Sequence, residues 1–206
     1  MAQFFQVHPD NPQHRLISRA VEMIRHGGVI VYPTDSSYAI ACHLNDKQAL
    51  DKIRRIRQLD DKHNFTLVCR DLTQIANFAK ISNDAHRLIK ALTPGPFTFI
   101  LDATREVPRR LQHPKKKTIG IRIPANAIAR QLVEELGEPL FSSTLIFPGE
   151  SESPADPYDI RERLEHDLDL VIDGGIVEYE PTTIISCAGH SPEIVRQGKG
   201  VASMLE

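Results

Sequence analysis

The sequence predicts an α/β fold: a single domain with a twisted, open, mixed sheet and flanking helices. A chain of 206 residues is long enough to bury a sizeable core in one domain. Apolar residues make up 41% of it and charged residues 25%, which is typical of a globular protein rather than a disordered one. Segments with helical periodicity alternate with short β-prone segments, and their uneven connections favour a mixed sheet. We expect one domain over residues 1–206, with its core at about 14–200.

The first half of the chain is predicted to begin with a helix over Pro12–His26, because its apolar residues repeat at helical spacing. Gly27-Gly28 ends this helix. A buried strand over Val29–Tyr32 follows, ended by Pro33, and a second helix begins near the N-cap pair Asn45-Asp46. The next elements are a strand over Thr66–Cys69 and helices over Leu72–Ala79 and Asn83–Leu92, the last capped by Ser82.

In the second half, Phe97–Leu101 has the strongest β-propensity of the chain. Thr118–Ile123 is predicted as a further strand, broken by Pro124. Asn126 caps a helix that Gly137 ends. The remaining strands are expected at Leu140–Ser143, Leu168–Ile172, Thr183–Cys187 and Ile194–Arg196.

Several classes of protein are disfavoured by what the sequence lacks. No run approaches the roughly 18 apolar residues of a transmembrane helix, and the N-terminus has no signal-peptide pattern. The three cysteines lack paired spacing, which favours a reducing cytoplasm over a disulfide framework. Neither common glycine-rich phosphate loop is present, and the nine histidines show no ligand spacing, so no metal site is predicted. We expect a cytoplasmic protein without a membrane partner.

The net charge of −2 hides a segregated distribution of charge. Residues 105–122 carry seven basic residues and one acid, a balance of +6, and residues 52–62 have a balance of +3. Residues 134–180 carry fourteen acids and two arginines, a balance of −12. Such segregation indicates a polyanion-binding face, although a solvated loop is an equally open interpretation. The candidate RNA-binding residues are Arg109, Arg110, Lys115, Lys116 and Lys117.

Hydroxyl side chains gather at the ends of three predicted strands, in Thr34–Ser37, Ser142–Thr144 and Thr182-Thr183. Ligands of open α/β sheets bind at strand ends, and hydroxyls with backbone N–H groups suit phosphates and carboxylates. Arginine forks bind the oxygens of such anions, and several arginines are close in sequence. Each stretch alone could satisfy a local turn, but their recurrence favours an anion site.

Seven short motifs resemble those of the YrdC-like proteins, the threonylcarbamoyl-adenylate synthases, and are most similar to the YciO branch of that family. They occur in family order from about Gly28 to Gly198. The matches are Val31–Cys42 to "PTDT-x-YGL", Thr93–Thr98 to "PGP-x-T", Ile119–Pro124 to "GVR-x-P", Gly137–Leu140 to "G-x-PL", Asp173–Gly175 to "DGG", Pro181–Thr183 to "PST", and Arg196–Gly198 to "R-x-G".

The resemblance implies a single α/β domain around a concave basic surface. It also implies a reaction that joins L-threonine, bicarbonate and ATP into threonylcarbamoyl-AMP and pyrophosphate, for tRNA threonylcarbamoyladenosine formation. Binding of double-stranded RNA is associated with the fold. In the implied reaction, a threonine carbamate attacks the α-phosphate of ATP, and Mg²⁺ and cationic side chains stabilise the charge on the phosphate oxygens.

Carried over to this chain, the motifs assign two sets of binding residues. Thr34 and Ser36, in the motif that also holds Tyr38, would bind the amino-acid end, with Arg122 available to its carboxylate. The nucleotide and phosphate region would be lined by Ser143, Thr182, Thr183 and Arg196.

Two motifs of the resemblance are altered in this chain. The "K-x-R" pair falls on Arg55 and Arg57, and "S-x-N" falls on Thr144 and Ile146, which makes Arg55, Arg57 and Thr144 the candidate catalytic residues. Isoleucine cannot form the hydrogen bonds of asparagine, and losing such a partner costs about 1–3 kcal/mol. Two functions follow as alternatives. One is a nucleotide- and RNA-binding paralogue, on double-stranded RNA or tRNA; the other is an active synthase with Mg-ATP and L-threonine as substrates and no tightly bound cofactor.

Overall fold

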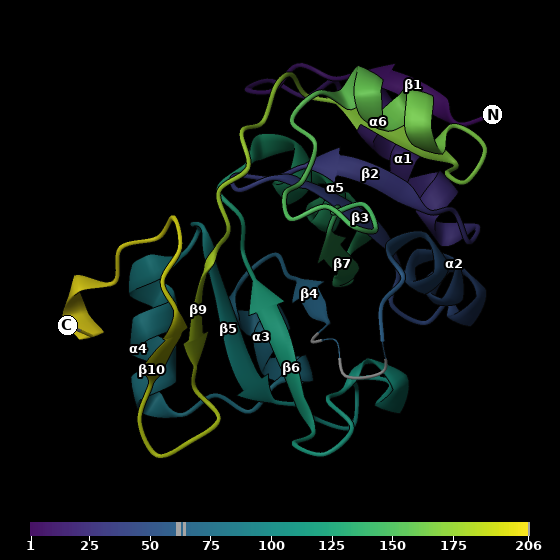
Figure 1. The fold of residues 1–206 in the computed structure, drawn as a ribbon. Helices are drawn as coiled ribbons and strands as arrows, with labels where there is room; N and C mark the ends of the chain where they lie inside the picture. The colour runs from purple at the N-terminus through teal and green to yellow at the C-terminus, as the bar shows by residue number, and fades with distance from the viewer. Residues whose placement is uncertain (61–62, 64, 206) are drawn as a thin grey trace.

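The computed structural model describes residues 1–60, 63 and 65–205, which form one α/β domain around a ten-stranded sheet (Figure 1). The strand order is β1-β8-β2-β3-β7-β4-β6-β5-β9-β10, and both parallel and antiparallel pairs occur within it. The predicted mixed open sheet with flanking helices is therefore confirmed. The strands are β1 (Gln3–Gln6), β2 (Ile30–Pro33), β3 (Tyr38–His43), β4 (Thr66–Val68), β5 (Phe97–Asp102), β6 (Thr118–Arg122), β7 (Leu140–Thr144), β8 (Leu170–Asp173), β9 (Thr183–Ser186) and β10 (Glu193–Arg196).

Three helices have the N-cap residues that the sequence predicts, and one ends at the predicted glycine. Asp46, Ser82 and Asn126 each accept a hydrogen bond from the backbone N–H three residues later, and Gly137 takes the left-handed conformation that ends its helix. The helices are α1 (His14–Arg25), α2 (Lys47–Arg57), α3 (Leu72–Phe78), α4 (Asn83–Leu92), α5 (Ala127–Leu136) and α6 (Pro157–Leu164), with the 3-10 turns η1 (Arg109–Leu111) and η2 (Ser203–Leu205).

Three elements in the structure were not predicted. β3 is an uninterrupted apolar strand that pairs with β2 from Ile30 to Pro33, so Pro33 is the last residue of β2 rather than its terminator. A proline is tolerated there because it lies at the end of the strand. β1 is a short strand at the edge of the sheet. α6 begins with the Asp156 cap and Pro157 in its first turn, but its apolar face is weak, which hid it from the periodicity argument.

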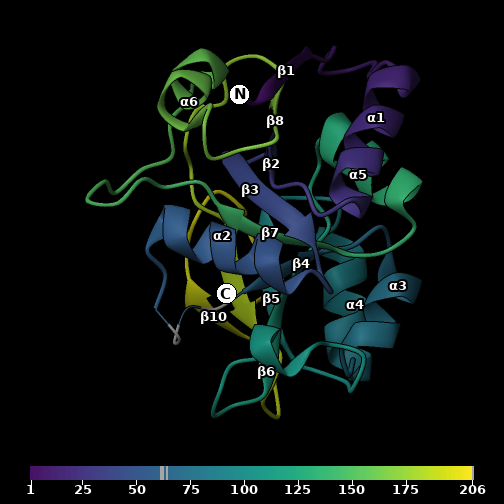
Figure 2. The ribbon, with the colours of Figure 1, turned by 90° about the vertical axis from the view of Figure 1, so that its right-hand side faces the viewer.

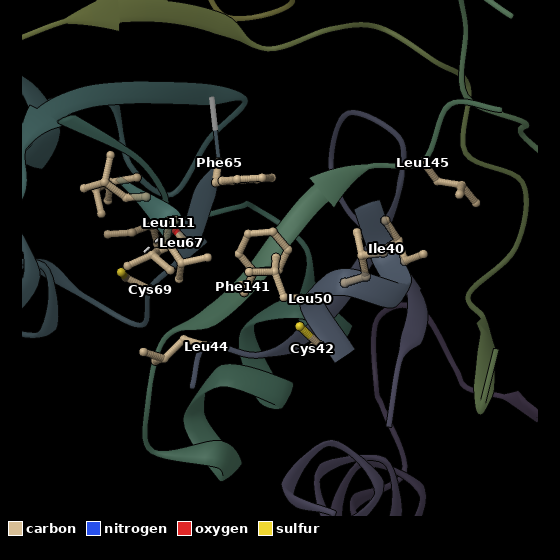
Figure 3. Packing of buried hydrophobic residues seen from close by; sticks show 14 of the residues in the cluster. Ile40, Cys42, Leu44, Leu50, Phe65, Leu67, Cys69, Leu111, Phe141 and Leu145 are labelled. Carbon is tan, nitrogen blue, oxygen red and sulfur yellow. Dashed lines mark hydrogen bonds between the residues drawn. The ribbon is translucent and has the colours of Figure 1, made fainter. Parts of the chain in front are cut away.

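Side chains alternate between the two faces of the sheet and form two cores. On one face, α1 and α5 lie side by side against β2 and β3, with Ile24 and Leu132 completely buried (Figure 2). On the other face, Leu50 of α2 packs beside Ile40 and Phe141 (Figure 3). The helices thus cover both faces of the β2–β3–β7 part of the sheet.

The other half of the sheet is covered by helices on one face. Phe99 of β5 and Ile121 of β6 are completely buried in the same core as Leu88 of α4. Figure 1 shows α3 and α4 behind β5, β6 and β9, with no helix in front of these strands. Because side chains alternate along a strand, the neighbours of these core residues point to the uncovered face. That face holds the cavity described below.

Candidate functional site

A cavity of about 390 Å³ lies on the uncovered face of the sheet, within the size range of ligand pockets. Thr66, Gly120, Thr98 and Ile184, on four strands of that half of the sheet, contribute to its lining. Gly120 is required there: a Cβ atom at this position would come within 2.8 Å of the Thr66 hydroxyl oxygen and 3.0 Å of a backbone carbonyl oxygen. The floor is therefore a close-packed strand surface with hydroxyl and apolar patches.

Arg57, the last residue of α2, enters the cavity from one wall. Its Nε donates to the backbone carbonyl oxygen of Ile146 at 2.9 Å, and its Nη1 donates to the carbonyl oxygen of Thr144 at 2.6 Å and to the Ser143 hydroxyl at 3.1 Å. Burial lowers the pKa of Arg57 from its ordinary value, and nearby Tyr179 acts in the opposite direction. Among the described residues, the partners of Arg57 are carbonyl and hydroxyl groups, and no ion pair there involves it.

Arg196 of β10 enters from the opposite side. Its Nη2 donates to the backbone carbonyl oxygen of Thr182 at 2.8 Å, and its Nε reaches the same oxygen at 3.3 Å. The Thr182 hydroxyl in turn lies 2.8 Å from that of Thr98. The residues of the cavity wall that the structure describes include no aspartate or glutamate. Two arginines that have no carboxylate partner among the described residues are an arrangement that suits an anion.

The loop between β2 and β3 forms the third wall through Ser36 and Ser37. Thr34 holds this loop: its hydroxyl donates to the Ser37 carbonyl oxygen at 2.8 Å and accepts the N–H groups of Ser36 and Ser37 at 3.1 and 3.2 Å. Beneath Ser36 lies Arg122, which is 7% exposed, donates to the Ser36 hydroxyl at 3.2 Å and pairs with Asp35. Of the expected binding residues Thr34, Ser36 and Arg122, only Ser36 lines the cavity.

The structure brings many of the sequence-predicted residues together in the cavity and leaves others outside it. Arg55 is exposed on α2 and is absent from the wall that Arg57 forms. Tyr38 is buried, donates to the Gly175 carbonyl oxygen at 2.7 Å and accepts the Gly174 N–H, and burial raises its pKa. The predicted residues that line the cavity are Ser36, Arg57, Ser143, Thr144, Thr182 and Arg196.

Thr183 has a structural partner instead of a place in the cavity. It is completely buried, donates to the Gly200 carbonyl oxygen at 2.6 Å and accepts the Gly198 N–H at 2.9 Å. These bonds fasten the segment after β10 onto β9. Strand alternation explains the difference from Thr182, whose hydroxyl points to the cavity.

The structure separates the five predicted RNA-binding residues, and only three of them line hollows of the surface. Lys116 lines a hollow that shares Ile100 with the cavity, whereas Arg109 and Lys117 line a separate one. Arg110 is half-buried and its Nη2 lies 3.5 Å from the Leu44 carbonyl oxygen, and Lys115 is exposed.

The basic residues of the +6 segment do not form one continuous surface. Lys117 directly precedes β6, and Arg122 is the last residue of that strand. The two residues therefore lie at opposite ends of a strand that rises about 3.3 Å per residue. The +6 segment is therefore not one patch. Asp61 and Lys62 of the +3 segment lie outside the described residues.

Sequence reasoning missed several residues of the cavity. Thr98 was part of a quoted motif but was not assigned to the site, although its alternation with Phe97 and Phe99 places it on the opposite face. His63 and Tyr179 come from irregular segments with no periodic signal. Burial and the charge of Arg57 lower the pKa of His63, against the influence of Asp60, and so favour the neutral ring.

The described part of the chain has neither a membrane-spanning helix nor a cluster of metal ligands. No helix there is long and apolar enough to cross a membrane. No cluster of three or more His, Cys, Asp or Glu side chains in that part could hold a metal ion.

Comparisons with known proteins agree with this architecture. The Escherichia coli (strain K12) protein named "Uncharacterized protein YciO" is 54% identical over 200 residues, 97% of each chain. The crystal structure of E. coli YciO matches with a TM-score of 0.96 over 100% of both chains, at 52% identity.

Other relatives are more distant. A threonylcarbamoyl-AMP synthase of Chromobacterium violaceum is 34% identical over 137 residues, 66% of this chain and 70% of that protein. The structure of P. abyssi Sua5 complexed with L-threonine has a TM-score of 0.87 at 25% identity, over 95% of this chain and 57% of that one. The Sua5/YciO/YrdC family model, described as "Telomere recombination", matches residues 22–198. The chain therefore belongs to the Sua5/YciO/YrdC family and is similar to YciO over its whole length.

Proposed function

We propose that the cavity binds a nucleoside triphosphate, with its phosphates between Arg57 and Arg196. One observation carries this proposal: the described part of the cavity wall joins two arginines and several hydroxyls and includes no carboxylate. The carbonyl oxygens of Thr144, Ile146 and Thr182 already accept from the two arginines. A ligand made of acceptor oxygens with at least two negative charges satisfies such a site, and phosphate groups have that chemistry.

The apolar part of the cavity accommodates the rest of the ligand. Ile100, Ile184 and the ring of Tyr179 lie on the lining together with the donors. A nucleoside that packs against these side chains would place its phosphates at Arg57 and Arg196. Mg²⁺ would arrive on the phosphates, because the cavity wall offers no carboxylate among the described residues to hold it.

Titration of the protein with Mg-ATP by calorimetry tests the proposal. Arg57→Gln and Arg196→Gln are each expected to weaken binding about 10- to 100-fold, the effect of losing a charged hydrogen bond. Arg87→Gln is the matched control, because Arg87 is an exposed helical arginine far from the cavity wall. Adenosine is expected to bind much more weakly than Mg-ATP. Equal affinity for the two ligands, or no binding of Mg-ATP, would overturn the proposal.

A synthase reaction at this site is the second candidate. The C. violaceum relative bears the name threonylcarbamoyl-AMP synthase, and the P. abyssi Sua5 structure holds L-threonine. In such a reaction the carbamate of L-threonine attacks the α-phosphate of ATP, and Arg57 and Arg196 would stabilise the charge on the phosphate oxygens. Release of pyrophosphate from Mg-ATP that requires both L-threonine and bicarbonate supports this candidate, and its absence at high protein concentration contradicts it.

RNA binding is the third candidate and rests on Lys116. This lysine and His113 line the hollow that adjoins the cavity at Ile100, so an RNA whose phosphates follow β5 could reach both hollows. Phosphate contacts make RNA affinity fall steeply with salt. A gel-shift series with double-stranded RNA and tRNA at rising salt tests this candidate, and affinity that does not depend on salt counts against it.

A further inference from the structure

β1 forms one outer edge of the sheet, and on its open side no described strand pairs with it. Figure 1 shows β1 at the top of the molecule, beside α6. The backbone N–H groups of Gln3 and Val7 donate to backbone carbonyl oxygens on the β8 side. Backbone groups alternate in direction along a strand, so those of Phe4 and Gln6 point to the open side. A hollow lined by β1 and Arg161 leaves this side accessible.

The two edges of the sheet are built differently. β10, at the other edge, has an irregular register between Ile194 and Arg196, and it carries the charges of Glu193 and Arg196. Bulges and charged side chains on an edge strand hinder pairing with another strand. β1 keeps a regular register with β8 and contains no charged residue and no proline. The β1 edge is therefore open to a further strand, whereas the β10 edge is protected.

The sequence of β1 is complementary to itself. Gln3-Phe4-Phe5-Gln6 reads the same in both directions, so an antiparallel second copy presents the same residue types. The outward backbone groups of both copies are used when the two-fold axis passes at Phe5. In this register Phe4 lies opposite Gln6 of the second copy, and each such pair exchanges both backbone hydrogen bonds. The two Phe5 residues then form an aromatic cross-strand pair.

The side chains of α6 above this edge match the same register. The Arg161 guanidinium lies 5.0 Å from the centre of the Phe4 ring, and the Gln6 amide donates to the Tyr158 hydroxyl at 2.7 Å. Because Phe4 lies opposite Gln6 of the second copy, Arg161 comes opposite Tyr158 of that copy. The Tyr158 side chain is held at the edge by Phe4, at 4.9 Å between ring centres, and is 52% exposed. A cation opposite an exposed aromatic ring attracts it, and the two-fold axis forms this pair twice.

We propose that two copies of this chain associate through β1, antiparallel about a two-fold axis at Phe5, and so join their sheets into one. The edge selects a second copy because it is uncharged and self-complementary, and because Arg161 and Tyr158 complement each other across the axis. The inference does not depend on the function of the cavity, since no residue of β1 lines the cavity.

Sedimentation velocity from micromolar to millimolar protein concentration tests the proposal. A dimer is expected, and Gln6→Pro should raise its dissociation constant about 10- to 100-fold, because each copy loses one backbone donor across the axis. Proline is tolerated at an outward position of an edge strand. Val195→Lys, at an exposed residue of β10, is the control and should leave the dimer unchanged. A monomer at every concentration, or a dimer that Val195→Lys weakens and Gln6→Pro does not, would overturn the proposal.

Two substitutions of Tyr158 test the contact with Arg161. Tyr158→Ala removes the ring and is expected to weaken the dimer about 10-fold, because the pair occurs twice. Tyr158→Phe keeps the ring and loses only the bond to Gln6, so it should retain most of the affinity. Equal losses for the two variants contradict the assigned contact.

Amide hydrogen exchange of the unmodified protein keeps the test valid if Gln6→Pro does not fold. Protection of the Phe4 and Gln6 amides should increase with protein concentration, because association gives them acceptors. The Gln3 and Val7 amides already have acceptors within one copy and should not change. A dimer without added protection at Phe4 and Gln6 has its interface elsewhere, which contradicts the proposal.

Discussion

The side chain of Arg57 donates to the backbone carbonyl oxygen of Ile146 at 2.9 Å. Ile146 falls where the family motif has asparagine, yet its main chain still helps to hold the arginine of the cavity. A backbone contact of this kind does not depend on the identity of the side chain. With isoleucine at this position Arg57 keeps its backbone partner, while the cavity wall has no hydrogen-bonding side chain there.

Restoring the amide is expected to change ligand binding at the same site. Ile146→Asn adds a donor and an acceptor to the cavity wall, and one hydrogen bond to a charged group corresponds to roughly a 10-fold gain in affinity for Mg-ATP. If the synthase candidate is correct, threonine-dependent pyrophosphate release should rise with it. Ile146→Val is the control, because it keeps the wall apolar. Equal affinity of the Asn and Val variants would show that the motif asparagine has no role in this cavity.

The two arginines of the altered "K-x-R" motif are expected to differ. Arg57 donates three hydrogen bonds at the cavity, whereas Arg55 is exposed outside it. Arg57→Gln should weaken Mg-ATP binding by about 10- to 100-fold, and Arg55→Gln should change it less than 2-fold. Titration of both variants under identical salt gives the comparison. Similar losses for the two would mean that the bound state differs from the present arrangement of α2.

Local signals in the sequence predict some elements of the fold and not others. The bounds of α4 and the caps Ser82 and Asn126 were predicted correctly, because caps and periodicity are local signals. β3 was not predicted, because its run of buried residues shows no alternation of polar and apolar side chains.

The cavity was only partly predictable, for a reason that lies in the strands. Thr182 and Thr183 are neighbours of the same kind, yet one faces the cavity and the other fastens a backbone segment. Sequence identifies polar residues at a strand end but not the face to which each points, because the face depends on the register with neighbouring strands. The resemblance to the family identifies the motifs. The pairing of the strands determines which motif residues line the cavity and which stabilise the fold.

Thr183 gives a stability prediction that leaves the site intact. Thr183→Val preserves the shape of the side chain but removes the bonds to Gly198 and Gly200 in a completely buried position. The Gly198 N–H then loses its partner, whereas the Gly200 carbonyl oxygen still accepts from Gln197, so the free energy of unfolding should fall by about 1–3 kcal/mol. Urea denaturation monitored by circular dichroism measures the loss. Thr73→Val, at a position on α3 away from the cavity, is a control of the same chemistry, and an equal change in both variants would contradict the assigned role.

His63 predicts a pH dependence of binding. Burial and the charge of Arg57 lower its pKa, so the ring is neutral above its ordinary value of about 6.5 and gains a proton only at lower pH. Protonation adds a third cation to the cavity wall, so affinity for a phosphate ligand should rise as the pH falls through this lowered pKa. Phosphate groups titrate nearby, with a pKa of about 6, so the measured quantity is the difference between wild type and His63→Gln. Identical profiles from pH 5 to 8 would contradict the prediction.

The stability effect of His63 has the opposite sign. A histidine with a pKa lowered on folding binds more protons in the unfolded chain, so its contribution to stability is present above about pH 6.5 and is lost as the pH falls through the folded pKa. His63→Gln removes this contribution. Urea denaturation of both proteins should therefore show a smaller loss of stability for the variant between pH 7 and pH 5, and a larger loss would contradict the assignment of a neutral buried ring.

Lys115 and Lys116 are adjacent lysines that the structure separates, which gives the RNA candidate its sharpest test. Lys116 lines the hollow that adjoins the cavity, and Lys115 is exposed outside it. Each phosphate contact contributes about 0.9 to the slope of log affinity against log salt for a duplex. Lys116→Ala should therefore lower the slope for double-stranded RNA by about one and Lys115→Ala should leave it unchanged. Equal slopes for both variants mean that RNA does not follow β5 into the hollow, and that these lysines form a solvated loop.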